Sequence, residues 1–291
     1  MRKIGASELI INSDGSVFHL HIRPEHLADK VILVGDPGRV DLVGSYLSEV
    51  ESETSSREFH SITGKYKGVG ITVLSTGIGC DNIDIVMNEL DALANVDFTT
   101  REIREQKRRL MVLRIGTCGI IQPDIPIGSY IFSKVSVGFD GLLNWYGDRD
   151  QVVDKAMEEA FLKHVDWNRY LPVPYFVRAS DRLASLFADC TVQGMTVSAP
   201  GFYGPQCRVV RLPIVMPDLM ERLESFGYDG MRILNFEMEG SAIASLARKL
   251  GHDGATVCLG IAQRYAQNAD ADYKSLMGAL VRLCLDKLAE S

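Results

Sequence analysis

Arg114 and Thr117 lie at the end of an apolar run, residues 111–119 (Met-Val-Leu-Arg-Ile-Gly-Thr-Cys-Gly). The first part of this run has the length and composition of a buried parallel strand, and the Gly-Thr-Cys-Gly tail is typical of the turn after a strand. In an open α/β sheet, ligands bind beyond the carboxyl ends of the strands. Arg114 and Thr117 would there meet a small anion and a hydroxyl-bearing substrate together. The alternative is an edge strand with Arg114 in solvent.

A second candidate anion site follows residues 30–34 (Lys-Val-Ile-Leu-Val), which predict another strand. The turn Gly-Asp-Pro-Gly-Arg at 35–39 comes next, and residues 40–47 have helical spacing. This order aims backbone N–H groups and a positive helix end at an anion. Gly35 permits close approach of the backbone, and Arg39 supplies a fork of donors. A plain β-turn uses the same residue types, so this motif alone leaves both interpretations open.

Arg57 is a third arginine near a strand end in the first half of the chain. Arginine offers planar bidentate donors that suit phosphate better than lysine does. Sequence spacing alone does not show that Arg39, Arg57 and Arg114 converge. For any one of these arginines, the simpler interpretation is a side chain that is exposed to solvent or paired with a carboxylate.

Two acids, Glu237 and Glu239, flank Met238 where a helix is expected to begin. Acidic residues are favoured in a first helical turn, so capping is one interpretation. In the other, one carboxylate accepts hydrogen bonds from paired sugar hydroxyls while Met238 packs on the apolar sugar face.

The segment 202–208 combines aromatic, amide and cationic side chains. Gln206 and Arg208, two residues apart, match the donors and acceptors of a pyrimidine dione, and Phe202 or Tyr203 would stack on its face. An ordinary polar loop is the alternative.

Strand and helix patterns alternate along the chain, which predicts a single α/β domain over residues 1–291. The segment 97–109 is rich in charges of both signs and predicts a solvated insertion or a surface helix. The remaining strands are expected at 71–74, 129–137, 192–198 and 255–261, and the remaining helices at 85–93, 152–164, 181–187, 216–226, 239–250 and 272–288.

The chain has 291 residues, of which 46% are hydrophobic and 24% charged, and its net charge is -7. This charge gives no electrostatic reason to expect a nucleic-acid partner, although it does not exclude small anions. Six cysteines without C-x-x-C spacing indicate reduced thiols rather than a disulfide framework. The N-terminus does not have the pattern of a signal peptide, and no charge-free apolar stretch is long enough to span a bilayer. We therefore expect a cytoplasmic protein without a membrane partner.

Six motifs occur in an order that resembles the uridine phosphorylase branch of the nucleoside phosphorylase-I family. They are Gly-Asp-Pro-Gly-Arg at 35–39, Arg-Glu-Phe at 57–59, Ser-Thr-Gly-Ile-Gly at 75–79, Leu-Arg-Ile-Gly-Thr at 113–117, Phe-Tyr-Gly-Pro-Gln-Cys-Arg at 202–208 and Phe-Glu-Met-Glu at 236–239. The resemblance extends from residue 17 to residue 261. It implies a single-domain three-layer fold with a central mixed, mostly parallel β-sheet flanked by helices.

The resemblance also implies an activity, the phosphorolysis of uridine, deoxyuridine or thymidine to the base and (deoxy)ribose 1-phosphate in pyrimidine salvage. The implied phosphate site consists of Gly35, Arg39, Arg114 and Thr117, with Arg57 reaching across a dimer interface. Ribose would contact Thr117, Met238, Glu239 and a neighbouring subunit's His19, which matches the histidine that binds the 5′-hydroxyl. The base site would comprise Gln206 and Arg208, with Phe202 and Phe236 as walls and Arg264 helping to order the pair.

The resemblance implies no organic cofactor and no catalytic metal, because inorganic phosphate is the co-substrate. Family members hold a structural monovalent cation, such as K⁺, at the dimer interface, with residues matched here by Glu58, Ile78 and Asn82, the last of which is often serine. A homo-oligomer is implied, with the dimer as its minimal unit and three dimers in a hexamer.

Two other activities of the same fold remain alternatives: a purine nucleoside phosphorylase and a hydrolytic nucleosidase. Purine-specific relatives carry an aspartate after the late strand, whereas residues 261–264 (Ile-Ala-Gln-Arg) contain no acid. A hydrolase has little use for three arginines around an anion. A non-catalytic nucleoside-binding protein would be expected to lack those arginines or Glu239. The order Gly204-Pro205, beside the base-reading pair, is the reverse of the usual order in the family.

Overall fold

The computed structural model describes residues 2–265, 268–269 and 273–291. The strands are β1 (Lys30–Val34), β2 (Ser48–Ser56), β3 (Phe59–Tyr66), β4 (Val69–Ser75), β5 (Val96–Asp97), β6 (Glu102–Ile103), β7 (Met111–Ile120), β8 (Tyr130–Gly138), β9 (Tyr175–Arg178), β10 (Val192–Ser198), β11 (Gly227–Tyr228), β12 (Met231–Glu237), β13 (Asp253–Gln263) and β14 (Asn268–Ala269). The α-helices are α1 (Pro37–Gly44), α2 (Cys80–Asn95), α3 (Lys155–Val165), α4 (Asp181–Leu186), α5 (Leu219–Ser225), α6 (Gly240–Leu250) and α7 (Lys274–Ala289). Short 3₁₀ turns are η1 (Pro24–His26), η2 (Leu142–Trp145), η3 (Arg149–Gln151) and η4 (Gly204–Gln206).

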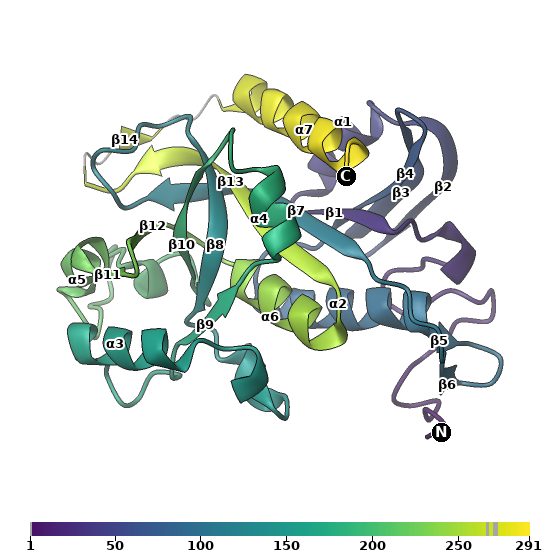
Figure 1. Ribbon diagram of the computed structural model, residues 1–291, viewed down its shortest axis with the longest axis horizontal. Coiled ribbons are helices and arrows are strands. Elements are labelled where there is room, and N and C mark those ends of the chain that lie inside the picture. Colours follow the sequence, from purple (N-terminus) through teal and green to yellow (C-terminus); the bar gives the residue numbers. More distant parts are fainter. Residues whose placement is uncertain (1, 266–267, 270–272) are drawn as a thin grey trace.

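One large mixed sheet forms the centre of the molecule, with strand order β11-β12-β10-β8-β13-β7-β1-β4-β3-β2 (Figure 1). The pairings β4–β1, β1–β7, β7–β13, β8–β10 and β10–β12 are parallel, whereas β2–β3, β3–β4 and β8–β13 are antiparallel. β12 also pairs antiparallel with β7. The strands β7, β13, β8, β10 and β12 therefore form a closed ring of pairings, which brings the ends of β7, β12 and β13 together.

Helices cover both faces of the sheet because side chains alternate along its strands. Ile32 and Val34 of β1 pack in one cluster with α1, α4 and α7, and Val31 and Leu33 pack in another with α2 and α6. A third cluster joins α3 and α5 to β8, β10 and β12. Figure 1 shows the resulting three layers, with α7 and α1 above the sheet and α2 and α6 below it. The predicted three-layer α/β fold is confirmed.

The structure corrects the sequence-based prediction at two segments. The tail Gly116–Gly119 is strand rather than turn, because β7 continues to Ile120 and pairs with both β13 and β12. The charged segment 97–109 is not a helix, since Val96–Asp97 and Glu102–Ile103 pair as a short antiparallel hairpin. Asp272, where the last helix was predicted to begin, lies outside the described residues.

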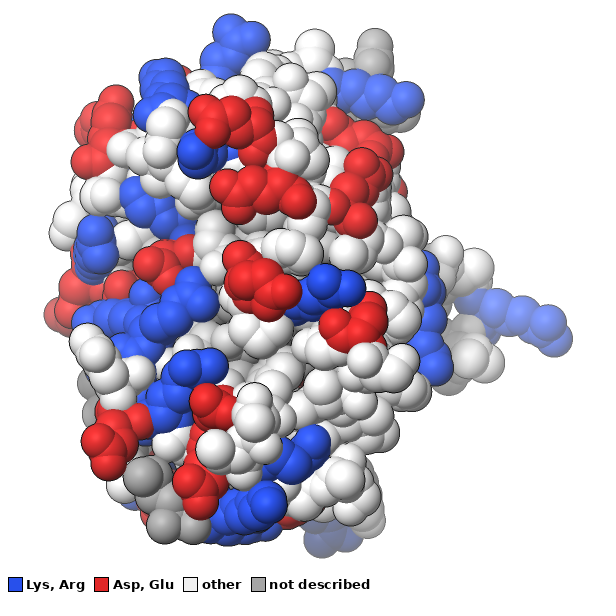
Figure 2. Space-filling view, turned by 90° about the vertical axis from the view of Figure 1, so that its right-hand side faces the viewer, with Lys and Arg blue, Asp and Glu red and all other residues white. Residues whose placement is uncertain are grey.

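The antiparallel edge of the sheet carried little sequence signal. β2 (Ser-Glu-Val-Glu-Ser-Glu-Thr-Ser-Ser) is almost wholly polar and is mostly exposed, so it does not have the apolar run of a buried strand. Basic and acidic side chains are intermixed over the face of the molecule drawn in Figure 2. Within the described ranges, no helix combines the length and the hydropathy needed to cross a membrane.

Candidate active site

A cleft of about 1350 Å³ opens where β7, β12 and β13 meet the turn between β1 and α1. It gathers most of the residues predicted for the phosphate, ribose and base sites. Those lining it are Gly35, Arg39, Arg114, Thr117, Phe202, Gln206, Arg208, Phe236, Met238, Glu239 and Arg264, together with Ile78. The residues contributed by segments far apart in the sequence thus share one concave site.

Arg114 is buried at the centre of the cleft and bound by two carboxylates. Its Nη1 lies 3.2 Å from Glu237 Oε2, and its Nη2 donates a hydrogen bond to Glu239 Oε2. Arg114 lies on the same face of β7 as Val112, which packs in the cluster of α2 and α6, so it points toward the residues where these two helices begin. Burial acts to lower the pKa of Arg114, but the charges of Glu239 and Glu237 outweigh it and raise the pKa. The guanidinium therefore stays charged.

The two acids of the Phe-Glu-Met-Glu motif have different roles. Glu237 Oε2 accepts hydrogen bonds from the backbone N–H groups of Glu239, at 2.9 Å, and Gly240, at 2.8 Å, so Glu237 caps the start of α6. Ser198 Oγ donates to the other oxygen of Glu237. Glu239 lines the cleft instead. The capping interpretation is therefore confirmed for Glu237, whereas sugar binding by Glu239 stays a prediction.

Two glycines without a predicted role hold this arrangement in place. A Cβ on Gly116 would lie 2.1 Å from Arg114 Nη1, because the guanidinium lies against the backbone of its own strand. The N–H of Gly79, at φ 107°, donates to Glu239 Oε1 at 2.7 Å. Burial raises the pKa of Glu239, and the positive charge of Arg114 opposes that shift. The only sequence signal for either position was a glycine beside a predicted site residue.

Arg39 brings a second cation to the same end of the cleft, which we call the phosphate end. Asp36 caps α1 by accepting a hydrogen bond from Gly38 N at 3.0 Å, and Arg39 follows in the first turn of that helix. Arg39 Nη1 donates to the carbonyl oxygen of Ile115 at 3.2 Å. Burial and the nearby charge of Arg114 both lower the pKa of Arg39. Two desolvated cations beside one another favour the binding of an anion.

The opposite end of the cleft, which we call the base end, is built on a loop. Arg208 Nη1 donates to Gln206 Oε1 at 2.5 Å and to the carbonyl oxygen of Phe202 at 2.7 Å. The guanidinium carbon lies 3.8 Å from the centre of the Phe202 ring. Burial and the charge of Arg264 lower the pKa of Arg208 to about 10. Gln206 is buried, and because its Oε1 accepts from Arg208, its amide N–H₂ is the group left to donate to a ligand.

Arg264 and Phe236 close the base end from the sheet side. Arg264 lies against Gly119. A Cβ added to Gly119 would lie 3.4 Å from Arg264 Cδ and 3.7 Å from Arg208 Nη2. Burial lowers the pKa of Arg264. Phe236 is fully buried in β12 and forms part of the cleft wall. The structure thus brings Arg264 close to Arg208, as the resemblance implied.

Four predicted residues do not line the cleft of their own chain. Arg57 is exposed at the tip of the β2–β3 hairpin, at φ 57°, and His19 lies in the segment before β1. Glu58 and Asn82 lie close to Gly77, where a Cβ would be 2.8 Å from Asn82 Nδ2 and 3.3 Å from Glu58 Cγ. Among the described residues, no cluster of three or more His, Cys, Asp or Glu side chains has the arrangement of a metal site.

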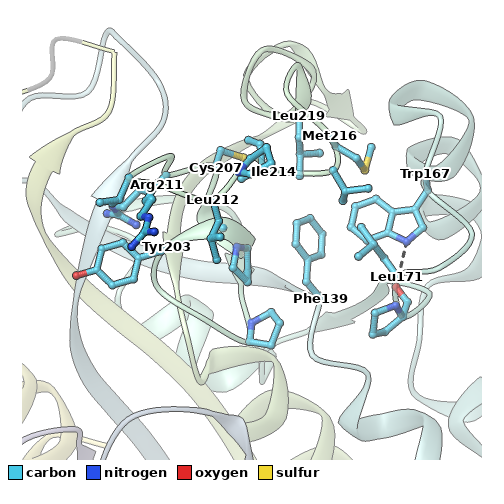
Figure 3. Close-up of a pocket in the computed structure, with 18 residues that line it drawn as sticks. Phe139, Trp167, Leu171, Tyr203, Cys207, Arg211, Leu212, Ile214, Met216 and Leu219 are labelled. Atoms are coloured by element: carbon cyan, nitrogen blue, oxygen red, sulfur yellow. Dashed lines mark hydrogen bonds between the residues drawn. The ribbon is translucent and has the colours of Figure 1, made fainter.

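A second cavity of about 1000 Å³ lies behind the base end (Figure 3). Its walls are mainly apolar, and Trp167, Phe139 and Met216 face into it, with Trp167 Nε1 donating to the carbonyl oxygen of Pro172 at 3.1 Å. Cys207 and Arg208 line both cavities. The two charged groups in its wall, Arg208 and Arg211, come from the loop after η4.

Residues 29–288 match the model of the family described as the phosphorylase superfamily. The chain is 30% identical over 270 residues to a uridine phosphorylase of Thermococcus kodakarensis, covering 91% of this chain and 83% of that protein. It is 26% identical over 243 residues to a guanosine phosphorylase of Halorubrum lacusprofundi, covering 82% and 80% of the two chains. The crystal structure of a Trypanosoma brucei nucleoside phosphorylase, described as showing uridine phosphorylase activity, superposes with a TM-score of 0.84 at 27% identity, over 97% of this chain and all of that one. The protein described here belongs to the phosphorylase superfamily.

Proposed function

We propose that the protein catalyses the phosphorolysis of uridine to uracil and ribose 1-phosphate. The observation that carries this proposal is the content of a single cleft: two desolvated arginines at one end, and an amide–guanidinium pair suited to a pyrimidine dione at the other. Relatives named uridine phosphorylase support the same substrate.

In this reaction, a phosphate oxygen attacks the anomeric carbon while the bond from that carbon to the base nitrogen breaks. Arg39 and Arg114 hold the anionic nucleophile against the carbon as it becomes cationic, so positioning supplies much of the rate. The electron pair of the broken bond goes to the base, where Gln206 and Arg208 stabilise the negative charge that develops on the dione. Phosphate is already an anion, so no step requires a histidine as base.

Glu239 has the capacity to orient the sugar. An ionised carboxylate has about four lone-pair positions. Glu239 uses one for Gly79 N–H and one for Arg114, which leaves acceptor positions for the ribose hydroxyls. Met238 and Thr117 line the same cleft, where they would contact the sugar.

Uridine consumption with and without phosphate tests the proposal, with the sugar product resolved and inosine measured in parallel. We expect phosphate-dependent release of uracil with ribose 1-phosphate, and little turnover of inosine. Free ribose formed without phosphate would instead identify a nucleosidase. Turnover of inosine alone would identify a purine phosphorylase, the activity suggested by the guanosine phosphorylase relative.

We also propose that the dimer is the minimal active unit and that three dimers form a hexamer. The proposal is supported by His19 and Arg57, which match substrate-binding residues of the family and do not line the cleft of their own chain. Mixing the inactive variants Arg57→Ala and Arg114→Ala tests it. If Arg57 completes the cleft of the neighbouring subunit, each mixed dimer contains one cleft with both arginines. Such a dimer should then have up to about half of the activity of a wild-type dimer. A fully active monomer in sedimentation would contradict the proposal.

We further propose a structural K⁺ ion at the dimer interface, held by Glu58, Ile78 and Asn82. A carboxylate, a backbone carbonyl and an amide oxygen are oxygen ligands of the kind that hard cations prefer. Glu58 and Asn82 both lie beside Gly77, which supports a common site. Replacing K⁺ with a bulky organic cation is expected to weaken the dimer in sedimentation, and an unchanged dimer would contradict the proposal.

A further inference from the structure

Glu89, in α2, is a buried carboxylate that binds one short segment of the chain. Its oxygens accept hydrogen bonds from the backbone N–H groups of His19, at 3.2 Å, and Leu20, at 3.0 Å. The imidazole Nδ1 of His19 lies 2.6 Å from Glu89 Oε1. Among the described residues, no lysine or arginine forms an ion pair with Glu89, so these N–H groups compensate its burial.

This contact determines which nitrogen of His19 is available. An ionised carboxylate only accepts hydrogen bonds, so Nδ1 carries a proton and donates it. In the neutral ring, Nε2 is then an acceptor, and no side chain or backbone group of the described residues binds it. The His19 side chain is 31% exposed, which leaves that nitrogen open to a group from outside the chain.

The rest of the segment holds the imidazole in place. Val17 and Leu20 on either side of His19 are fully buried, and Val17 N donates to the carbonyl oxygen of Ile22 at 3.0 Å. The Phe18 ring packs edge-on against the imidazole, with centroids 4.8 Å apart. Since the ring is packed on one side and hydrogen-bonded on the other, Nε2 has a defined direction at the surface.

We infer that Glu89 is a positioning residue, which fixes His19 so that its Nε2 accepts a hydrogen bond from the 5′-hydroxyl of a nucleoside bound in a neighbouring subunit's cleft. This inference rests on the proposed function and on the exchange of His19 between subunits. It adds a residue of α2 that touches no substrate and acts only through the imidazole. If Glu89 merely stabilised the segment, its loss would affect all substrates alike.

The test compares uridine with 5′-deoxyuridine, which lacks the hydroxyl that His19 would bind. We expect His19→Ala to lower the ratio of kcat/KM for uridine to kcat/KM for 5′-deoxyuridine by about three- to tenfold, the range for one lost hydrogen bond. Glu89→Gln is expected to lower the ratio by a similar factor while leaving kcat/KM for 5′-deoxyuridine near its wild-type value. The double variant should show no further decrease, because Glu89 acts through His19.

Glu53→Gln is the matched control, because Glu53 Oε1 lies 3.2 Å from Nε2 of another histidine, His60, in an exposed pair outside the proposed machinery. It should leave the ratio unchanged. If Glu89→Gln does not fold, Glu89→Asp keeps the carboxylate with a shorter reach and should give an intermediate ratio.

Two outcomes would overturn the inference. In the first, Glu89→Gln lowers kcat/KM for uridine and for 5′-deoxyuridine by the same factor. In the second, His19→Ala leaves the ratio of the two kcat/KM values at its wild-type value. The proposed function would survive either result, because phosphate-dependent release of uracil is measured separately. Absence of that release in the wild-type protein would remove the proposed function itself.

Discussion

At the phosphate end of the cleft, Arg114 is buried within strand β7 and bound by two carboxylates, whereas at the base end Arg208 is half-buried in a loop and bound by two neutral oxygens. The same side chain thus has a raised pKa at one end and a lowered pKa at the other. Arg114 is fixed by the fold before any ligand binds. Among the described residues, Arg208 is a desolvated cation without a carboxylate partner, so a base that becomes negative is a favourable partner for it.

Phosphate binding and base recognition therefore depend on different parts of the fold. The phosphate end uses the ends of strands in the sheet and is coupled to global stability. The base end uses η4 and the residue after it, Cys207, at φ 57°, so it depends on local loop geometry. Substitutions at the two ends should therefore differ in their effect on stability as well as on activity.

The largest effect is expected from Arg114→Ala. It removes the cation between Glu237 and Glu239 and leaves both carboxylates buried, which should lower the free energy of unfolding by about 3–5 kcal/mol. Loss of a preorganised charge should lower kcat/KM by about a thousandfold. Urea unfolding and steady-state kinetics measure the two effects. Arg232→Ala, which breaks an exposed pair with Asp124, should cost at most about 1 kcal/mol.

Gly116→Ala tests whether the phosphate end depends on the position of Arg114 rather than on its charge alone. The new Cβ would overlap the guanidinium, so Arg114 must move while remaining in the protein. A displacement of this size is expected to lower kcat/KM by about a hundredfold. Gly147→Ala is the control, because a Cβ at Gly147 meets nothing within 4 Å. Wild-type kinetics in Gly116→Ala would show that the geometry of Arg114 is not critical.

Arg208→Ala should separate the two ends. We expect kcat/KM for uridine to decrease by about a hundredfold, with the free energy of unfolding changed by no more than about 0.5 kcal/mol. Phosphate at a hundred times its Kd should still stabilise this variant by about 2.7 kcal/mol, which thermal unfolding measures. Arg211→Ala, in the same loop but lining the second cavity, is the control. Loss of phosphate stabilisation in Arg208→Ala would show that the two ends are coupled.

The smallest effect is expected from Phe202→Ala. The ring is 50% exposed and lies over the Arg208 guanidinium, an arrangement worth about 0.5–1 kcal/mol at exposed sites. The KM for uridine should therefore rise about two- to fivefold, with kcat nearly unchanged. Tyr203→Ala serves for comparison, since Tyr203 lines only the second cavity. A larger loss of kcat in Phe202→Ala would mean that the ring holds Arg208 in its working position.

The alternating apolar patterns predicted the α/β fold, whereas the full set of cleft residues was implied by the resemblance of six motifs to a known family, because spacing alone does not show which side chains converge. The apolar runs of β1, β7 and β13 indicated buried strands, and the polar groups at their ends indicated the site. Sequence reasoning did not predict that Gly116–Gly119 continues β7, since that depends on pairing with β12 from the far end of the chain. For the same reason, the division of roles between Glu237 and Glu239 became visible only when Ser198 and Arg114 were placed beside them.

The ring of strand pairings has a consequence for the order in which the protein folds. β7 pairs with β12 at Ile120 and Asn235, more than a hundred positions apart, and β13 joins the ring from still later in the chain. Pairings between such distant residues form slowly because the intervening chain must first be brought together. A nascent chain that ends before β12 holds β1, β3 and β4 but lacks Phe236, Glu239 and Arg264 of the cleft. We therefore expect substrate binding to be the last property that the refolding protein regains, well after most of its secondary structure.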